Sequence, residues 1–477
     1  MSVARPLGAA LLLGGTVLPL AFVATGATAG LGKAMVLALA VPAAGIVLLH
    51  PILPLFLMVV FIPLDALANR IFSFLPVSPA TALTAATAAA FALRLPQRPR
   101  TARLGVDDPV LRWLALFALA AVVSLIFADN RQMATDAMGR ISGMMALLLL
   151  TVLVIEQHWQ MRLVVLGFIG ATLFSGAIVI METILGVRLL SSQEAAVTAA
   201  WRGVARSAGA SDYNPTAVAI MTGAGTVLAL VLLVEWPRHR MLTFATALVG
   251  TVSVVLSFAR SAALCFTLVT LVWAWRHRRN RYFPLGLMTA VLAVFAALPF
   301  VPELYWQRMG TLLNFDADYT LWRRLGYNLI GVELFLEHPL VGVGPGNFPH
   351  HYIDSDYRFM PGRTLFSRDL HNMYLGVAVE LGLLAFIPFL AMIGTGVLGL
   401  RRAIATTRDA EINAFSTALL FTAAGYLLSA TFLPSQFHKL TWILIGLTCV
   451  QARLARQSGI SPLHNVGGGD EARGGRQ

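Results

Sequence analysis

Charged residues are scarce in this sequence, and their scarcity excludes an ordinary soluble globular protein. Asp, Glu, Lys and Arg make up 12% of the 477 residues, whereas 57% are hydrophobic. A soluble domain carries about 25% charged residues. Apolar stretches recur along nearly the whole chain, and each approaches the length needed to cross a hydrocarbon core of roughly 30 Å. The lipid bilayer is therefore the predicted main solvent of the chain.

Cysteine is nearly absent, and the acidic residues are scattered. Cys265 and Cys449 lie far apart in apolar stretches, so neither a disulfide framework nor a Cys-type metal site is expected. The carboxylates expected outside the membrane show no spacing that would gather them around a cation, and they include Asp212, Asp316, Asp318, Asp354 and Asp356. We therefore predict no metal and no cofactor.

The basic residues indicate membrane topology. The net charge is +12, but Lys and Arg concentrate in short loops between apolar stretches, a pattern that disfavours nucleic acid as a partner. The positive-inside rule predicts cytoplasmic loops at 94–103, 238–240, 276–281 and 401–408, and cytoplasmic termini. Counting spans from these loops places three stretches in the periplasm of a bacterial inner membrane: 187–215, 257–260 and 302–370.

Hydropathy predicts an all-α polytopic membrane protein of about 12 to 14 spanning helices. The first apolar stretch resembles a signal peptide, but the next one follows at once, which favours a span. Breaks at His50-Pro51 and at Ser257–Arg260 leave re-entrant or half-length segments open. The candidate spans are 7–25, 33–49, 52–64, 78–94, 110–127, 140–155, 163–186, 216–234, 241–257, 261–275, 282–300, 372–399, 411–430 and 439–452.

These spans predict four parts. They are an N-terminal transmembrane bundle at 1–301, a large periplasmic loop at 302–370, C-terminal transmembrane helices at 371–452 and a disordered cytoplasmic tail at 453–477. Within the loop, a helix is predicted over 321–338 because Leu325, Leu329, Val332 and Leu336 share one face. The Gly-rich run at 341–346 favours a turn over a phosphate cradle, since it lacks the Lys and Ser/Thr of a P-loop.

Polar residues that could carry chemistry gather at the predicted periplasmic level: Arg206, Arg260, Arg323, Arg324 and His371. A guanidinium fork matches phosphate oxygens, and a His can accept a proton near neutral pH. Together they suggest glycosyl transfer, in which His371 is the base and the Arg side chains stabilise a departing diphosphate. A single Arg at a helix end also serves as a snorkelling anchor, and a lone His as an interfacial residue, so both readings stay open.

Several motifs carry a family resemblance over about residues 200–400. They are Asn214-Pro215 after an Arg-Gly stretch, the corner Ser257–Ser261, Arg324 upstream of Pro339, the run Pro339–Phe348, and His371-Asn372-Met373-Tyr374-Leu375 followed by Glu380-Leu381-Gly382. In this order they resemble the O-antigen ligase and polymerase superfamily. Ala259 departs from the pattern, in which Ser usually precedes the Arg, so only Arg260 is carried over at that corner.

The resemblance implies a GT-C-like fold, an undecaprenyl-diphosphate glycan donor and a metal-independent inverting mechanism. Asn214, Asn372, Tyr374 and Glu380 are possible supporting residues. Glu380 falls on the opposite helix face from His371 and roughly 13 Å deeper, which favours a packing or network role over a catalytic one.

The acceptor is less constrained. The compact chain with one large loop favours ligation to lipid A core, whereas polymerisation of O-antigen or exopolysaccharide and O-glycosylation of protein would use the same residues. A transporter of a lipid-linked sugar or anion is the alternative of another class. A transporter would concentrate polar groups near the bilayer midplane in two related halves, and no such repeat is visible.

Overall fold

The computed structural model describes residues 50–97, 107–190, 209–212, 214–281, 283–284, 288, 310, 319–364 and 366–460. Within these residues every regular element is an α-helix or a 3-10 helix, and none is a strand. Eight segments in this part of the chain are long and apolar enough to cross a membrane: Ile52–Ile71, Pro109–Ile126, Arg131–Val154, His158–Leu185, Pro215–Glu235, Pro237–Leu256, Met373–Thr406 and Ala410–Phe432. The predicted all-α, multi-pass membrane fold is confirmed.

The described helices match the predicted spans in position, but the last one continues to Ile460, so residues 453–460 are helical and not part of a disordered tail as predicted. They are α3 (Ile52–Phe61), α4 (Asp65–Ile71), α5 (Pro79–Arg94), α6 (Pro109–Ile126), α7 (Arg131–Val154), α8 (His158–Leu185), α10 (Pro215–Glu235), α11 (Arg240–Leu256), α12 (Arg260–Arg276), α15 (Tyr319–Glu337), α16 (Phe348–Tyr352), α17 (Met373–Thr406), α18 (Ala410–Ser429) and α19 (Lys439–Ile460). The predicted spans 7–25 and 33–49, and nearly all of 282–300, lie outside the described residues.

Short polar side chains fix where several helices begin. Asp108 and Asn214 each stand directly before a proline and accept a hydrogen bond from the backbone N–H two residues on. Such a cap satisfies a backbone donor that has no partner within the helix, and proline fits the first helical position. Asn130 caps α7 by accepting from Met133 N, and α7 begins at Arg131, well before the predicted start at 140. The polar first turns of α7 carry no hydropathy signal.

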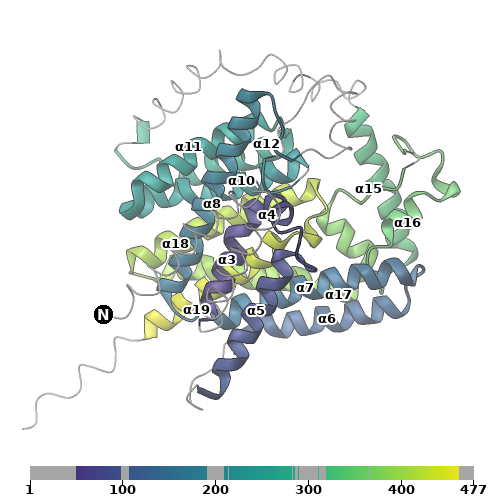
Figure 1. Cartoon of the computed structure of the whole chain (residues 1–477), viewed down its shortest axis with the longest axis horizontal. Helices are drawn as coiled ribbons and strands as arrows, with labels where there is room; N and C mark the ends of the chain where they lie inside the picture. The colour runs from purple at the N-terminus through teal and green to yellow at the C-terminus, as the bar shows by residue number, and fades with distance from the viewer. Residues whose placement is uncertain are drawn as a thin grey trace, which may run out of the picture.

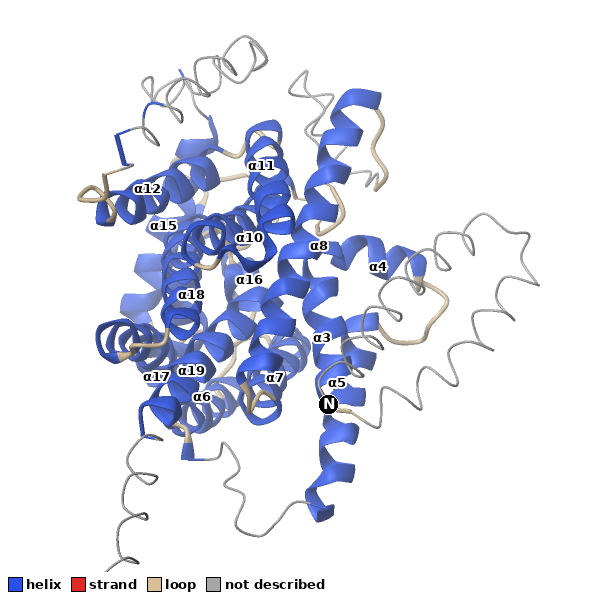
Figure 2. Ribbon diagram, turned by 90° about the vertical axis from the view of Figure 1, so that its left-hand side faces the viewer, coloured by secondary structure: helices blue, strands red, loops and turns tan. Residues whose placement is uncertain are grey.

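The two ends of the bundle differ: one carries ion pairs between helices, and the other carries α15 and α16. At one end, Arg162 of α8 pairs with Glu411 of α18, and Arg453 of α19 lies 3.6 Å from Asp108. We call this the far end. The other, which we call the loop end, carries α15 and α16 and lies to the right in Figure 1. α6, α7 and α17 run between the two ends and are seen nearly end-on in Figure 2.

α17 is broken at Gly382, which has φ 69° and ψ −178°. The loop after α15 pairs with the backbone on both sides of this break. Val343 N and Gly344 N donate to the carbonyls of Val379 and Glu380, both at 3.0 Å. Leu383 N donates to Pro339 O at 2.9 Å, and Leu384 N to Leu340 O at 3.2 Å. The loop therefore supplies the hydrogen bonds that a continuous helix would have made internally.

The Gly-rich run forms a buried turn against the bundle. Gly344 and Gly346 have φ of 106° and 66°, a backbone region that side chains rarely adopt. A Cβ on Gly344 would lie 2.4 Å from the Ala128 side chain, and one on Gly346 would lie 2.6 Å from Ala137. Both the backbone conformation and the close approach require glycine, in agreement with the predicted turn.

The predicted helix in the long loop is confirmed as α15, but its two faces differ from a simple reading of the leucines. The buried face carries Tyr327, Ile330 and Leu334, which form a small core with residues of α16 and α17. The stripe Leu325, Leu329, Val332 and Leu336 lies on the opposite face and is exposed. The buried face also includes Gly331, which packs against Leu370 and Leu375. Because this face contains a tyrosine and a glycine, leucine spacing alone does not identify it.

We expect Gly382→Ala to destabilise the protein. The substitution places a side chain at positive φ and sets a Cβ about 2.2 Å from Leu340 O, so the loop must shift. Such a backbone position costs on the order of 1–3 kcal/mol, which should lower the thermal unfolding midpoint in detergent. Gly394→Ala in the same helix is the matched control, because a Cβ there meets nothing within 4 Å. Equal midpoints for the two variants would show that the break does not depend on glycine.

Candidate functional site

His371 lies at the loop end, just before α17 begins, and is half-buried. Its Nδ1 is 2.8 Å from the backbone carbonyl of Asp369. A carbonyl can only accept, so Nδ1 carries the proton and Nε2 keeps its lone pair. This tautomer, assigned from the hydrogen bond, is the one a general base needs. Asn372 follows at the helix cap, where its Oδ1 accepts from Tyr374 N at 3.1 Å and Leu375 N at 3.2 Å.

An aromatic ring packs against the face of the His371 imidazole. Tyr327 of α15 stacks on His371 with ring centroids 5.2 Å apart and an interplanar angle of 26°. Tyr327 is itself buried, with 4% of its surface exposed, and meets Tyr352 of α16 edge-on at 5.5 Å. The position of His371 therefore depends on both helices of the loop.

Three guanidinium groups lie near this pair. Arg324 and Arg368 act electrostatically on His371, and Arg323 acts with them on Tyr327. Burial is the largest cause of a lowered pKa at His371; the hydrogen bond to the Asp369 carbonyl and the Asp369 carboxylate oppose it, while Arg324 and Arg368 lower the pKa further. The imidazole is therefore neutral near pH 7 and able to accept a proton.

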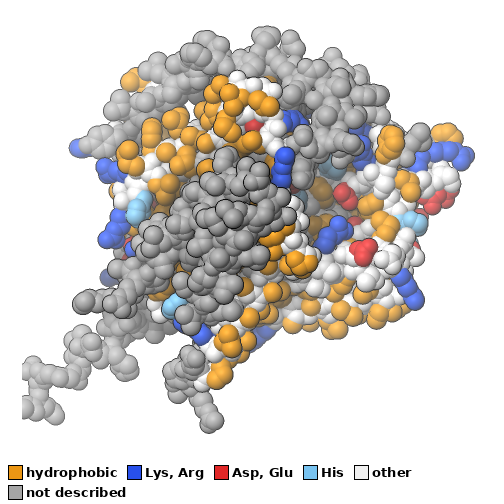
Figure 3. Space-filling view, viewed as in Figure 1, with side chains coloured by type: hydrophobic (Ala, Val, Ile, Leu, Met, Phe, Trp, Pro, Cys, Tyr) orange, Lys and Arg blue, Asp and Glu red, His pale blue; other side chains and the backbone are white. Residues whose placement is uncertain are grey.

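Charge gathers on this side of the molecule. In Figure 3, most of the acidic and basic side chains visible at the right lie over α15, α16 and the loop that follows, while the lower face over α6 and α7 is mainly hydrophobic. A cluster of charges at one end of an apolar bundle fits chemistry at the membrane surface better than at the midplane.

Arg260 is the first residue of α12 and is half-buried. The corner before it is tightly held: Ser257 Oγ donates to Val254 O at 2.7 Å and accepts from Ala259 N at 3.3 Å, and Phe258 has φ 54°. The corner is therefore a turn between two separate helices, α11 and α12, which leaves Arg260 at the loop end.

Arg260 and Arg324 both lie toward the same end of α18. The Phe266 ring of α12 packs against Gly425 of α18. At a rise of about 1.5 Å per residue, Arg260 lies roughly 9 Å nearer the loop end than Phe266. Arg324 lies 5.6 Å from the ring centroid of Phe432, which closes the same end of α18. The structure thus brings Arg260, Arg324 and His371 to one end of the bundle.

Arg206 lies outside the described residues, so its position is not assigned. The described residues on either side of 191–208 meet at one buried carboxylate. Glu182 accepts from Leu189 N at 2.9 Å and from Gly209 N at 3.0 Å. Asn214, which follows, caps α10 by accepting from Thr216 N at 2.9 Å.

Tyr374 and Glu380 hold helices together. The Tyr374 hydroxyl donates to Leu427 O at 2.9 Å and joins α17 to α18. The buried Glu380 carboxylate accepts from the backbone N–H groups of Gly346 and Phe348 at the start of α16. These contacts agree with the packing or network role predicted for Glu380.

The sequence interpretation did not assign Tyr327 or Arg368 to the site. Tyr327 lies one helical turn beyond Arg323 and Arg324, and Arg368 stands three residues before His371. Helical spacing could have placed Tyr327 on the Arg face of α15, but the stack on His371 joins residues from two elements and leaves no local signal.

We expect the pKa of His371 to rise in Arg324→Gln, because the positive charge that disfavours the imidazolium is removed. Diethyl pyrocarbonate modifies only neutral imidazole, so peptide-resolved mass spectrometry between pH 5 and pH 8 reports the midpoint. The midpoint for His371 should move to higher pH in Arg324→Gln and stay unchanged in Arg358→Gln, an exposed Arg elsewhere in the loop. A midpoint that does not move would show that Arg324 and His371 are not electrostatically linked.

Part of the chain is similar to a known protein family. Residues 243–390 match the family described as O-Antigen ligase. The match runs from α11 into α17 and includes Arg260, Arg323, Arg324, His371 and Glu380. No curated protein matches the chain. The chain therefore has the helices of a multi-pass membrane protein, and its residues 243–390 are similar to the O-antigen ligase family.

Proposed function

We propose that this protein transfers O-antigen polysaccharide from undecaprenyl diphosphate to lipid A core at the periplasmic face of the bacterial inner membrane. The observation that carries the proposal is the hydrogen bond from His371 Nδ1 to the Asp369 carbonyl. It leaves Nε2 as a base beside the positive charge of Arg324 and Arg368. A neutral base next to fixed cations suits a reaction in which a hydroxyl loses a proton and a diphosphate departs.

In the proposed step, an acceptor hydroxyl attacks the anomeric carbon of the donor's first sugar. The hydroxyl proton passes to His371 Nε2 as the new carbon–oxygen bond forms. The bond from that carbon to the diphosphate oxygen breaks, and the electron pair leaves with undecaprenyl diphosphate. Attack opposite the leaving group inverts the configuration at the anomeric carbon.

In this proposal, the Arg residues stabilise the diphosphate leaving group. Arg260 and Arg324, with Arg206 from the preceding loop, would hold the diphosphate, and Arg323 would be a weaker contributor. A diphosphate carries two or three negative charges, and about three guanidinium groups can balance them by bidentate hydrogen bonds. This balance supports a metal-independent mechanism, in which the guanidinium groups do the work that a divalent cation does in other enzymes.

One experiment tests both the reaction and the acceptor. The purified full-length protein is incubated with lipid-linked glycan and, in parallel, with lipid A core, free lipid-linked glycan or a pilin-type protein, each with and without excess EDTA. Glycan on lipid A core, unaffected by EDTA, supports the proposal. Product only on the second or third acceptor would reassign the enzyme as a polymerase or a protein glycosyltransferase. Donor movement across proteoliposomes without transfer would indicate a transporter.

We expect His371→Ala to abolish transfer while the variant still folds. Loss of a general base typically costs roughly a hundredfold to ten-thousandfold in rate. His350→Ala is the matched control, because His350 is an exposed imidazole on α16 in the same loop. Initial rates of glycan transfer, with elution profile and thermal midpoint as folding checks, decide the matter. Near-normal turnover in His371→Ala would remove it as the base.

Arg324→Lys should lose activity even though the charge is kept. A lysine ammonium cannot reproduce the planar fork, so transfer should fall by about tenfold to a hundredfold. Arg358→Lys, at an exposed Arg that lies over Phe359, should retain the wild-type rate. Equal rates for the two Lys variants would mean that bidentate recognition at Arg324 plays no part.

A further inference from the structure

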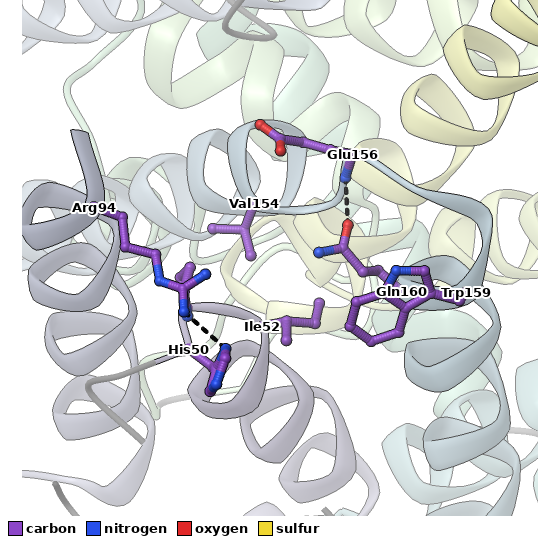
Figure 4. Close-up of a pocket in the computed structure, with 8 residues that line it drawn as sticks. His50, Ile52, Arg94, Val154, Glu156, Trp159 and Gln160 are labelled. Atoms are coloured by element: carbon purple, nitrogen blue, oxygen red, sulfur yellow. Dashed lines mark hydrogen bonds between the residues drawn. The ribbon is translucent and has the colours of Figure 1, made fainter. Parts of the chain in front are cut away.

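A cavity of about 270 Å³ opens at the far end of the bundle, away from His371. Figure 4 shows the side chains that line it, from the ends of α3 and α5 and from the turn between α7 and α8. The lining residues are His50, Pro51, Ile52, Arg94, Val154, Glu156, Trp159 and Gln160. The proposed glycosyl transfer uses none of them.

The cavity lies at the ends of apolar helices. His50 stands just before α3, Arg94 is the last residue of α5, and Glu156 lies between α7 and α8. Ile52 and Val154 give the cavity an apolar wall, and Trp159 adds an amphipathic ring of the kind enriched at membrane interfaces. A ligand here would meet both the headgroup layer and the ends of the spans.

Arg94 and His50 form a fixed pair of donors. Arg94 Nη2 lies 2.8 Å from His50 Nδ1. A guanidinium can only donate, so Nδ1 accepts and the proton of the neutral imidazole is on Nε2. Burial, and then the Arg94 charge, lower the pKa of His50, which favours the neutral imidazole. The pair therefore carries one permanent positive charge and offers N–H groups.

Gln160 adds a further donor to the lining. Its Oε1 accepts from Glu156 N at 2.7 Å and from Gln157 N at 3.0 Å, so the amide NH₂ is the group left for other partners. Glu156 contributes one carboxylate to the lining, and this carboxylate acts electrostatically on Arg453. The lining thus combines the Arg94 charge and the N–H groups of His50 and Gln160 with one carboxylate.

We propose that this cavity binds the phosphate of an anionic membrane phospholipid. A guanidinium with nearby N–H donors is suited to phosphate oxygens, and basic pockets between the ends of spanning helices typically hold anionic lipid headgroups. The apolar wall would contact the glycerol and the first carbons of the acyl chains. Free phosphate shares the headgroup chemistry but gains nothing from that wall.

The test measures lipid binding to the purified full-length protein by native mass spectrometry. Dioleoylphosphatidylglycerol, dioleoylphosphatidylcholine and inorganic phosphate are the three probes. Phosphatidylglycerol should bind at least about tenfold more tightly than phosphatidylcholine, and Arg94→Gln should weaken its binding about tenfold, as expected for loss of a charge-assisted hydrogen bond. Arg402→Gln is the matched control, an exposed Arg at the far end of α17.

Three results would overturn the proposal. They are equal phosphatidylglycerol affinity in Arg94→Gln and Arg402→Gln, equal affinity of the wild type for the two phospholipids, and displacement of bound lipid by millimolar inorganic phosphate. Arg94→Lys covers the case in which Arg94→Gln fails to fold; it keeps the charge but loses the fork, so its affinity should fall between those of the wild type and Arg94→Gln.

Discussion

The break in α17 at Gly382 is the constraint on which the arrangement at the loop end depends. A helix interrupted inside an apolar bundle leaves backbone groups without partners, and each such group costs several kcal/mol in a lipid-like environment. The segment 339–344 meets this demand on both sides of the break. Ser124 of α6 also bonds to this stretch, since its Oγ donates to Glu380 O at 2.9 Å. The loop is therefore anchored to the bundle by backbone chemistry.

The anchored loop then positions the candidate site. The Glu380 carboxylate accepts from the backbone at the start of α16, so the same stretch of α17 that receives the loop also fixes the short helix that follows. Tyr352 of α16 contacts Tyr327, and Tyr327 stacks on His371. A residue that accepts a proton in a reaction needs a fixed orientation. Here the orientation of His371 is set by contacts that begin close to the helix break.

The described spans could be predicted from the sequence, and the site residues proposed, because both signals are local. A spanning helix must be apolar over its whole length, and His371 and Arg324 stand in a recognisable order of motifs. Three features escaped prediction because they depend on contacts between distant residues. These are the backbone pairing at Gly382, the choice of the Tyr327 face of α15 as the buried one, and the polar first turns of α7. Leucine spacing on α15 favoured the face that the structure leaves exposed.

In the proposed reaction, the lone pair of His371 Nε2 faces the sugar while guanidinium groups hold the diphosphate. A cryo-electron microscopy structure of the protein with undecaprenyl-diphosphate-linked glycan tests it most directly. We expect diphosphate oxygens within hydrogen-bond distance of Arg260 and Arg324. We also expect Nδ1 of His371 to remain bonded to the Asp369 carbonyl and Nε2 to point at the space beside the anomeric carbon. A diphosphate bound away from these Arg residues, or an imidazole turned so that Nε2 faces the Asp369 carbonyl, would contradict it.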